Sequence, residues 1–166
     1  MSSNFTISLF LLVAIACLSE GCCPERFMQV GNRCYYYNSG KVDWHDARAA
    51  CLRLGAHLVS IHSFQESAQV YALWKSLVDE SLRDNSDAAY WIGLNDERIE
   101  GSFKWSDGTH TDYTLWQAGE PNDSNGGEDC VAPRNQGRND FDRQKWNDNQ
   151  CGNRKSYFCR RSLYRS

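Results

Sequence analysis

The sequence has little of what nucleic-acid-binding or membrane-spanning proteins need. It contains no block or stripe of Lys and Arg, and its formal net charge is −3, so nothing indicates a nucleic-acid partner. Its one apolar run, Ile7–Leu18, is shorter than the roughly 20 residues that cross a bilayer, and no second run follows. With no internal repeat or low-complexity segment, the 166 residues predict a single domain.

Common catalytic motifs are also missing. There is no His-Glu-x-x-His helix motif, no nucleophile elbow and no phosphate-binding loop. Pairs of Asp and Glu can hydrolyse glycosides, but the spacing of the Asp and Glu residues in this chain indicates metal ligands instead. We therefore expect no enzyme and no catalytic residues.

The N-terminus and the cysteines indicate export. Residues 1–21 resemble a secretory signal peptide, with cleavage near Gly21, although the segment before the apolar run has no Lys or Arg. A second possible cleavage, after Ala16, would leave Cys17 in the mature chain. The eight cysteines are irregularly spaced, which is typical of disulfides rather than of zinc ligands. We expect a secreted, extracellular protein whose domain is residues 22–166.

Local patterns predict an α+β fold. Two helices are expected, one after Asp43 and ended by Gly55, and one from Ser63 with Glu66 as a capping-box partner. A hairpin and several short strands are expected from β-rich runs bounded by turn residues. The expected strand segments are 27–37 (the hairpin), 57–61, 89–94, 103–105, 130–131, 145–148 and 157–160.

A long polar loop precedes Cys130. Its last ten residues, Glu120–Asp129, hold four carboxylates and two Asn amides with almost no apolar side chain. Carboxylate and amide oxygens suit Ca²⁺, which takes six to eight oxygen ligands, and do not suit zinc. The alternative is a solvated acidic turn. Tyr113, Leu115 and Trp116 are suitably placed to anchor the loop, which favours an ordered, functional segment.

Further motifs in order along the chain resemble the C-type lectin-like family, especially the small secreted lectins of invertebrate body fluids and related shell or matrix lectins. The resemblance covers residues 23–160. It rests on Cys23-Pro24, Cys34-Tyr35, His57-Leu58-Val59-Ser60-Ile61, Trp91-Ile92-Gly93-Leu94, Glu100-Gly101, Trp105, Asp107-Gly108, Glu120-Pro121-Asn122, Glu128-Asp129-Cys130, Trp146-Asn147-Asp148 and Cys159. It implies two helices, small antiparallel sheets and a long calcium-organised loop.

The resemblance also implies the disulfide pairing, which spacing alone leaves open. The implied pairs are Cys23–Cys34, Cys51–Cys159 and Cys130–Cys151. Cys22 is then left over and is a candidate for an interchain bond in a disulfide-linked homodimer. The alternatives are a capped thiol or an exchange of roles with Cys23.

The principal calcium site of the family maps onto Glu120, Asn122, Glu128, Asn147 and Asp148, the same residues that would bind carbohydrate. Two vicinal sugar hydroxyls would each give a lone pair to Ca²⁺, donate to a carboxylate and accept from an Asn amide. The Glu120–Pro121 bond resembles the family's cis peptide, a form that the Pro makes accessible. An auxiliary calcium site resembles Asp96, Glu100, Asp123, Glu128 and Asp129; the alternative is a solvated acidic cluster.

The Glu-Pro-Asn motif goes with equatorial 3- and 4-hydroxyls, as in mannose, N-acetylglucosamine or fucose-type sugars. The galactose type would have Gln and Asp at positions 120 and 122, often followed by a Trp, and here no Trp follows until Trp146. A repositioned aromatic, from Tyr113, Trp116 or the charged insertion 133–143, would favour galactose instead. That insertion is expected near the sugar rim.

We therefore expect a calcium-dependent lectin whose partners are glycans, with a role in innate defence or agglutination, and with ligand release at low pH. The first alternative is a biomineral or extracellular-matrix protein, although the chain lacks an acidic repeat. The second is a venom or defence effector that binds a protein, although such relatives usually lose the calcium ligands.

Overall fold

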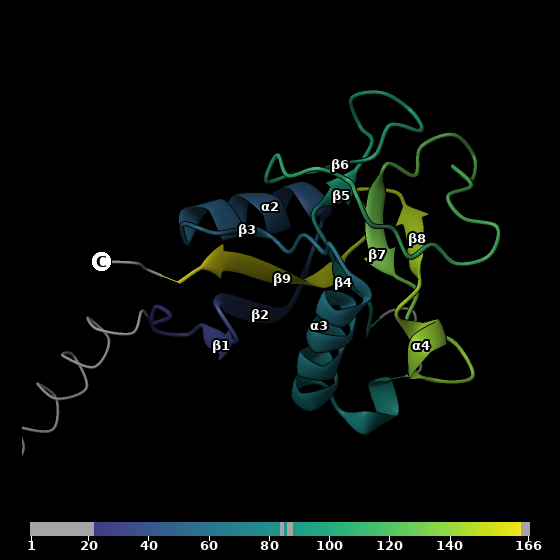
Figure 1. Cartoon of the computed structure of the whole chain (residues 1–166). Coiled ribbons are helices and arrows are strands. Elements are labelled where there is room, and N and C mark those ends of the chain that lie inside the picture. The colour runs from purple at the N-terminus through teal and green to yellow at the C-terminus, as the bar shows by residue number, and fades with distance from the viewer. Residues whose placement is uncertain (1–21, 84, 86–87, 164–166) are drawn as a thin grey trace, which may run out of the picture.

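Two small sheets and three helices build the part of the chain that the structure describes (Figure 1). The computed structural model describes residues 22–83, 85 and 88–163, so the predicted signal peptide lies outside the described residues. The first sheet comprises β1 (Met28–Val30), β2 (Arg33–Val42), β9 (Lys155–Ser162), β3 (His57–Leu58) and β4 (Tyr90–Trp91). The second comprises β6 (Lys104–Trp105), β5 (Leu94–Asn95), β7 (Cys130–Pro133) and β8 (Trp146–Asn149). The helices are α2 (Trp44–Arg53), α3 (Phe64–Leu77) and α4 (Asp140–Arg143), with a 3-10 turn, η1 (Glu80–Leu82).

The first sheet brings the two ends of the domain together. β9 pairs antiparallel with β2 and β3, and parallel with β4. The hairpin predicted at the start of the domain is present as β1 and β2, with Gly31 at φ +59 in its turn. Figure 1 shows the loops that join β5 to β8 gathered on the side of the molecule away from β1 and the end of β9.

Both predicted helices begin at the predicted caps. The Asp43 carboxylate accepts a hydrogen bond from the Asp46 amide at 2.8 Å, and the Ser63 hydroxyl accepts one from the Glu66 amide at 3.1 Å. Glu66 departs from the capping-box pattern, because its carboxylate accepts from the amide of His62 rather than from that of Ser63. Gly55 ends the first helix at φ +63, where a residue with a Cβ would be strained.

The core is aromatic. Four tryptophans, Trp44, Trp74, Trp91 and Trp105, are all at most 2% exposed. Trp146 is fully buried as well and lies in the cluster that includes Trp74 and Trp105. Burial of such large side chains is the main favourable term in a domain of this size.

All three disulfides implied by the resemblance are present: Cys23–Cys34, Cys51–Cys159 and Cys130–Cys151. The second closes a separation of 108 residues and joins α2 to β9, which limits the freedom of the unfolded chain. Cys22 is also disulfide-bonded. Because a sulfur already in a disulfide offers no thiol for a second chain, the interchain bond predicted for Cys22 has no support in the structure.

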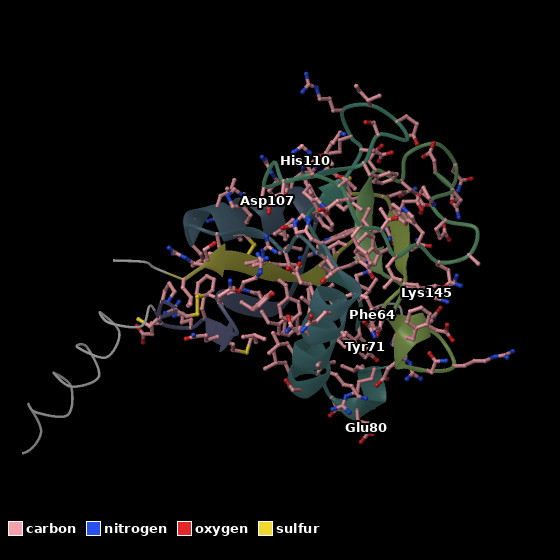
Figure 2. The ribbon with its side chains drawn as sticks, in the orientation of Figure 1. Phe64, Tyr71, Glu80, Asp107, His110 and Lys145 are labelled. Atoms are coloured by element: carbon pink, nitrogen blue, oxygen red, sulfur yellow. A yellow bond between two sulfur atoms is a disulfide. The ribbon has the colours of Figure 1, made fainter. Side chains whose placement is uncertain are left out.

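The insertion 133–143 differs from expectation, because it holds a third helix. The Asn139 side chain caps α4 by accepting from the Asp142 amide at 2.9 Å. Figure 2 shows Phe64 and Tyr71 of α3 on the side that faces α4, with Lys145 close by. Tyr71 donates to Asp140 at 3.1 Å, and Phe64 packs edge-on against Phe141. Tertiary contacts therefore stabilise a helix too short to be stable alone.

Candidate functional site

Trp146 anchors the long polar loop. Its backbone amide donates to the carbonyl of Leu115 at 2.7 Å, and its carbonyl accepts from Gln117 at 2.9 Å. Its ring makes edge-on contacts with Tyr113 and Trp116 at centroid distances of 5.8 and 5.9 Å. The prediction that these aromatic residues hold the loop in place is confirmed.

Asp148 organises the acidic end of that loop. It lies on β8, is 1% exposed, and its Oδ2 accepts hydrogen bonds from the backbone amides of Asn122 and Asp123 at 2.9 and 2.7 Å. Its other oxygen, Oδ1, is buried and has no hydrogen-bond partner among the described residues. A buried carboxylate oxygen without a partner is costly unless a cation satisfies it.

Glu120 faces the same place. The Glu120–Pro121 peptide bond is cis, as the resemblance implied. The Glu120 Oε2 is a second buried oxygen without a partner among the described residues. Burial raises the pKa of the Glu120 carboxyl, and the neighbouring carboxylates of Asp148 and Glu128 raise it further. Such mutual repulsion is what a bound cation would relieve.

Glu128 is held by a tight turn. Asp123, at φ +42, accepts from the backbone amides of Gly127 and Glu128 through its Oδ1. The Glu128 carboxylate accepts in turn from the Ser124 amide at 3.1 Å. Its pKa is raised by burial and by the charges of Asp148 and Asp123.

The residue set fits a calcium ion. The structure brings the carboxylates of Glu120, Glu128 and Asp148 into one electrostatic cluster, and Asn147 directly precedes Asp148 on β8. Asn122 joins them through its backbone amide. Ligand oxygens of this kind suit Ca²⁺, and the two unpartnered carboxylate oxygens are where such an ion would be needed.

The auxiliary set is brought together only in part. One carboxylate oxygen each from Asp96, Glu100 and Asp129 lies within 4.8 Å of the others, whereas Asp123 and Glu128 do not belong to that group. Asp96 is 2% exposed and its Oδ1 is buried without a partner among the described residues. Burial raises the pKa of Asp96 to about 6, with added repulsion from Glu100 and Asp129. These three residues also fit a cation.

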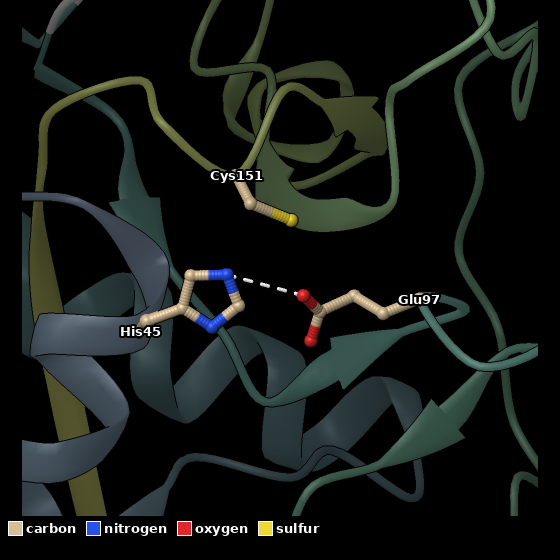
Figure 3. A group of neighbouring side chains, drawn as sticks. All are labelled: His45, Glu97 and Cys151. Carbon is tan, nitrogen blue, oxygen red and sulfur yellow. Dashed lines mark ion pairs between the residues drawn. The ribbon is translucent and has the colours of Figure 1, made fainter.

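A further cluster of metal-ligand residue types lies nearby but is not a metal site. Figure 3 shows His45 and Glu97 joined as an ion pair, with the sulfur of Cys151 beside them. The His45 Nε2 and the Glu97 Oε1 are 3.1 Å apart. Because the Cys151 sulfur is bonded to Cys130, no thiolate is available to bind a metal.

Sequence reasoning placed the insertion near the sugar rim but did not find which residues reach it. Pro133, Arg134 and Gln136 line a hollow together with Glu120 and Asn147 of the principal set. Lys155, at the start of β9, lines it from a different strand, in the other sheet. No local sequence signal marks Lys155, because only the fold brings β9 beside this hollow.

Comparisons with known proteins agree with this architecture. The family described as "Lectin C-type domain" matches residues 40–161. The low affinity immunoglobulin epsilon Fc receptor of Homo sapiens is 38% identical over 129 residues, which are 78% of this chain and 35% of the receptor. This chain thus spans about a third of that relative. The galactose-specific lectin nattectin of Thalassophryne nattereri is 32% identical, over 96% of this chain and 97% of nattectin.

Two further similarities concern mannose-containing ligands. The C-type lectin mannose-binding isoform of Oxyuranus scutellatus is 35% identical, over 96% of this chain and 98% of that protein. The cow C-type carbohydrate-recognition domain of CD23, solved in the presence of a GlcNAc2Man3 oligosaccharide, superimposes with a TM-score of 0.70 at 37% identity, over 87% of this chain and 98% of that chain. This chain belongs to the C-type lectin domain family.

Proposed function

We propose that this protein is a secreted, calcium-dependent lectin without catalytic activity. Glu120, Asn122, Glu128, Asn147 and Asp148 would hold Ca²⁺ and the sugar together. When bound, the ion would supply coordination positions that two vicinal sugar hydroxyls can fill. The carboxylates of Glu120 and Glu128 would accept the hydroxyl protons, and the amides of Asn122 and Asn147 would donate to the hydroxyl oxygens.

The observation that carries the proposal is the pair of buried, unpartnered oxygens on Glu120 and Asp148. A solvated acidic turn would leave its carboxylates in water. Here one oxygen of Glu120 and one of Asp148 are buried, and the pKa of Glu120 is raised first by burial and then by the like charges around it. This arrangement destabilises the folded protein when no cation is bound, and a divalent cation would relieve that destabilisation.

Secretion rests on the predicted signal peptide and on the disulfides, which persist in oxidising compartments. Within the described part of the chain, no helix is long and apolar enough to cross a membrane. A role in innate defence or agglutination is part of the proposal, and rests on the family alone. The auxiliary set of Asp96, Glu100, Asp123, Glu128 and Asp129 is proposed as a second calcium site that orders the loop.

The sugar class that we propose is the mannose type, with equatorial 3- and 4-hydroxyls, on the strength of Glu120 and Asn122. The aromatic side chains that could favour galactose instead pack against other aromatic rings of the protein. Trp116 packs on Phe103 and Trp146, Tyr113 packs on Trp146, and Phe141 of the insertion packs on Phe64. The galactose-specific relative keeps galactose as the alternative. Nothing on the surface described favours a mineral-binding role over either sugar.

Affinity chromatography tests the proposal directly. The secreted protein is loaded on mannose and galactose resins in Ca²⁺ and eluted with a chelator. We expect retention on mannose and release by the chelator. The double variant Glu120→Gln/Asn122→Asp should lose mannose and gain galactose, because it exchanges the acceptor and donor positions around the hydroxyls.

Glu97→Gln is the matched control, because Glu97 is a half-exposed carboxylate near the loop that pairs with His45. It should behave as the wild type on both resins. Retention that the chelator does not reverse would contradict the calcium-dependent mechanism. Sugar binding should also be lost at about pH 4, near the ordinary pKa of Glu, because protonated carboxyls release Ca²⁺.

A further inference from the structure

A hollow of about 270 Å³ opens beside the principal site. We call Glu120, Asn122, Glu128 and Asn147, which would hold the two sugar hydroxyls, the sugar clamp. Glu120 and Asn147 also line the hollow, so a sugar bound at the principal site would extend into the hollow. The rest of the polar lining is cationic or amide-bearing: Arg134, Gln136, Asn149 and Lys155. None of these four residues is among the calcium ligands.

The backbone around Arg134 is fixed. Arg134 directly follows β7, and its amide donates to the carbonyl of Lys145 at 2.7 Å. The next residue, Asn135, is 1% exposed and donates through its side chain to the carbonyl of Asn85 at 2.8 Å and through its backbone to Arg143 at 3.1 Å. The insertion therefore holds Arg134 at the hollow as part of the folded domain.

The Arg134 side chain has no internal role that would account for it. It is exposed, and no ion pair or side-chain hydrogen bond joins its guanidinium to any residue that the structure describes. The carboxylate that feels its charge is Glu120, whose pKa it lowers against the larger effects of burial and of Asp148. If Ca²⁺ were bound to Glu120, the positive charge of Arg134 would act on a ligand group that enters the hollow.

Lys155 supplies a second positive charge. Its Nζ lies 5.4 Å from the centroid of the Trp91 ring, which fixes the stem of the side chain against the core. Its charge acts on Glu128, as that of Arg134 acts on Glu120. Each of the two cations thus acts on one of the two acidic residues, Glu120 and Glu128, that we propose hold the sugar.

The positive charges lie on the side of the site where the hollow opens. Glu120, Glu128 and Asp148 carry three negative charges, two of which a bound Ca²⁺ would offset. Arg134 and Lys155 add positive charge at the lining of the hollow itself. A neutral sugar needs no such field, whereas an anionic group is attracted to it. The guanidinium is suited to two parallel hydrogen bonds with a sulfate or carboxylate.

We propose that this hollow binds an anionic substituent, a sulfate ester or a carboxylate, on the glycan whose vicinal hydroxyls occupy the principal site. The proposal rests on the proposed lectin function and narrows its substrate class to acidic glycans. Arg134 is the main specificity-determining residue, and Lys155 assists it.

Competition binding with the full secreted protein tests this. The protein is bound to immobilised mannan in Ca²⁺ and displaced with methyl mannoside, its 6-sulfate, or methyl mannuronoside. All three keep the same 3- and 4-hydroxyls. We expect at least one anionic analogue to compete about fivefold better than the neutral one, the ratio that corresponds to one exposed charge pair of about 1 kcal/mol. The preferred analogue identifies the anion. The galactose series on a galactan replaces these probes if the protein prefers galactose.

Arg134→Gln should bring the ratio close to one while the neutral sugar binds as before. Arg138→Gln is the matched control, since Arg138 is an exposed arginine of the same insertion whose charge acts on Asp142 rather than on the hollow. It should keep the wild-type ratio. Lys155→Gln should lower the ratio in part.

A wild-type ratio near one, with chelator-sensitive binding of the neutral sugar, would overturn the subsite and leave the lectin function standing. A preference that survives in both Arg134→Gln and Lys155→Gln would also overturn it, because the anion would then bind elsewhere. If no sugar, neutral or anionic, is retained in Ca²⁺, the proposed function fails and the subsite fails with it.

Discussion

Acidic side chains in two regions of this molecule are treated in opposite ways by the fold. The first region is the body, by which we mean the two sheets with α2 and α3, and it includes Asp107, which follows β6 (Figure 2). The Asp107 carboxylate accepts hydrogen bonds from the hydroxyls of Ser60 and Thr109 and lies 3.6 Å from the guanidinium of Arg160. Burial raises its pKa, but these partners outweigh burial and the net shift is downward. The second region is the loop face, by which we mean the candidate site of residues 120–129, Asn147 and Asp148 with the neighbouring Asp96 and Glu100. There Asp148 and Glu120 keep buried oxygens with no partner among the described residues.

The difference separates a carboxylate that completes the fold from one that we propose binds a cation. A carboxylate that completes the fold arrives with its donors, because an unsatisfied one would destabilise the native state. On the loop face the donors that are present come from the backbone of the loop itself, as with Asn122 and Asp123 on Asp148. We propose that a bound cation satisfies the remaining oxygens.

The largest expected effect follows from removing the charge at the centre of the loop face. Asp148→Asn keeps an oxygen for the amides of Asn122 and Asp123 but loses the charge, so Ca²⁺ affinity should fall at least about 100-fold, the upper end of what even an outer-shell partner contributes. Isothermal calorimetry with Ca²⁺ measures it.

Asp107→Asn is the counterpart in the body. It should destabilise the domain by about 1.5–3 kcal/mol, the usual worth of hydrogen bonds to a charged group, and leave Ca²⁺ affinity unchanged. Equal losses of Ca²⁺ affinity in the two variants would show that the comparison is wrong.

Calcium itself should stabilise the fold. An ion that binds only the native state at a concentration 100 times its Kd contributes about 2.7 kcal/mol per site. We expect the Tm to rise in Ca²⁺ and to fall in chelator, with a smaller rise in Asp148→Asn. A Tm that does not respond to either would show that the loop face is stable without a cation.

The pH dependence of stability should have opposite signs in the two regions. Without calcium, the folded Asp96 has its pKa raised from 3.8 to about 6, mainly by burial. Between these values the folded state holds more protons than the unfolded state, so this group's contribution to stability falls as pH rises. Asp107, with its lowered pKa, contributes stability that is lost as pH falls.

Chemical denaturation in chelator, compared between wild type and Asp96→Asn from pH 4 to pH 7, isolates the Asp96 contribution. The variant should be relatively more stable at pH 7 than at pH 4. In saturating Ca²⁺ the order should reverse, since the wild type gains the ion. A wild-type advantage at pH 7 in chelator would contradict the burial of an unpaired charge at this position.

The smallest effect is expected from a change confined to the body. Ser63→Ala removes the cap of α3 and should cost about 1 kcal/mol of stability. Sugar binding and Ca²⁺ affinity should not change, because none of the hydrogen bonds and ion pairs found among the described residues joins Ser63 to the loop face. A loss of Ca²⁺ affinity would mean that the two regions are coupled through α3.

Much of the fold was predictable from local chemistry. Asp43, Ser63 and Gly55 set helix ends through hydrogen bonds and φ preferences that span a few residues, so the sequence alone suffices for them. The short strands were found in outline, but the segment 89–94 is divided into β4 and β5, because Ile92 and Gly93 bond to Val131 and Val59 instead of continuing one ladder. The helix α4 was missed, since its stability comes from contacts with α3.

The candidate site divides in the same way. The ligand types and their order along the chain are properties of the sequence, and the resemblance assigned them to a site together with the disulfide pairs. The burial of Asp148, the unpartnered oxygen of Glu120 and the partial assembly of the auxiliary set depend on which backbone amides reach which carboxylate, and the sequence does not specify this.

The sequence by itself therefore determined the two principal helices, the cysteine set and the inventory of oxygen ligands, because each depends on nearest neighbours or on residue chemistry. Only the tertiary structure decided that Arg134 and Lys155 face one hollow beside Glu120 and Asn147. These residues come from an insertion and from the last strand, and they are brought together because β9 pairs with β4, which packs against β7. Long-range packing places the charges that we propose select the ligand.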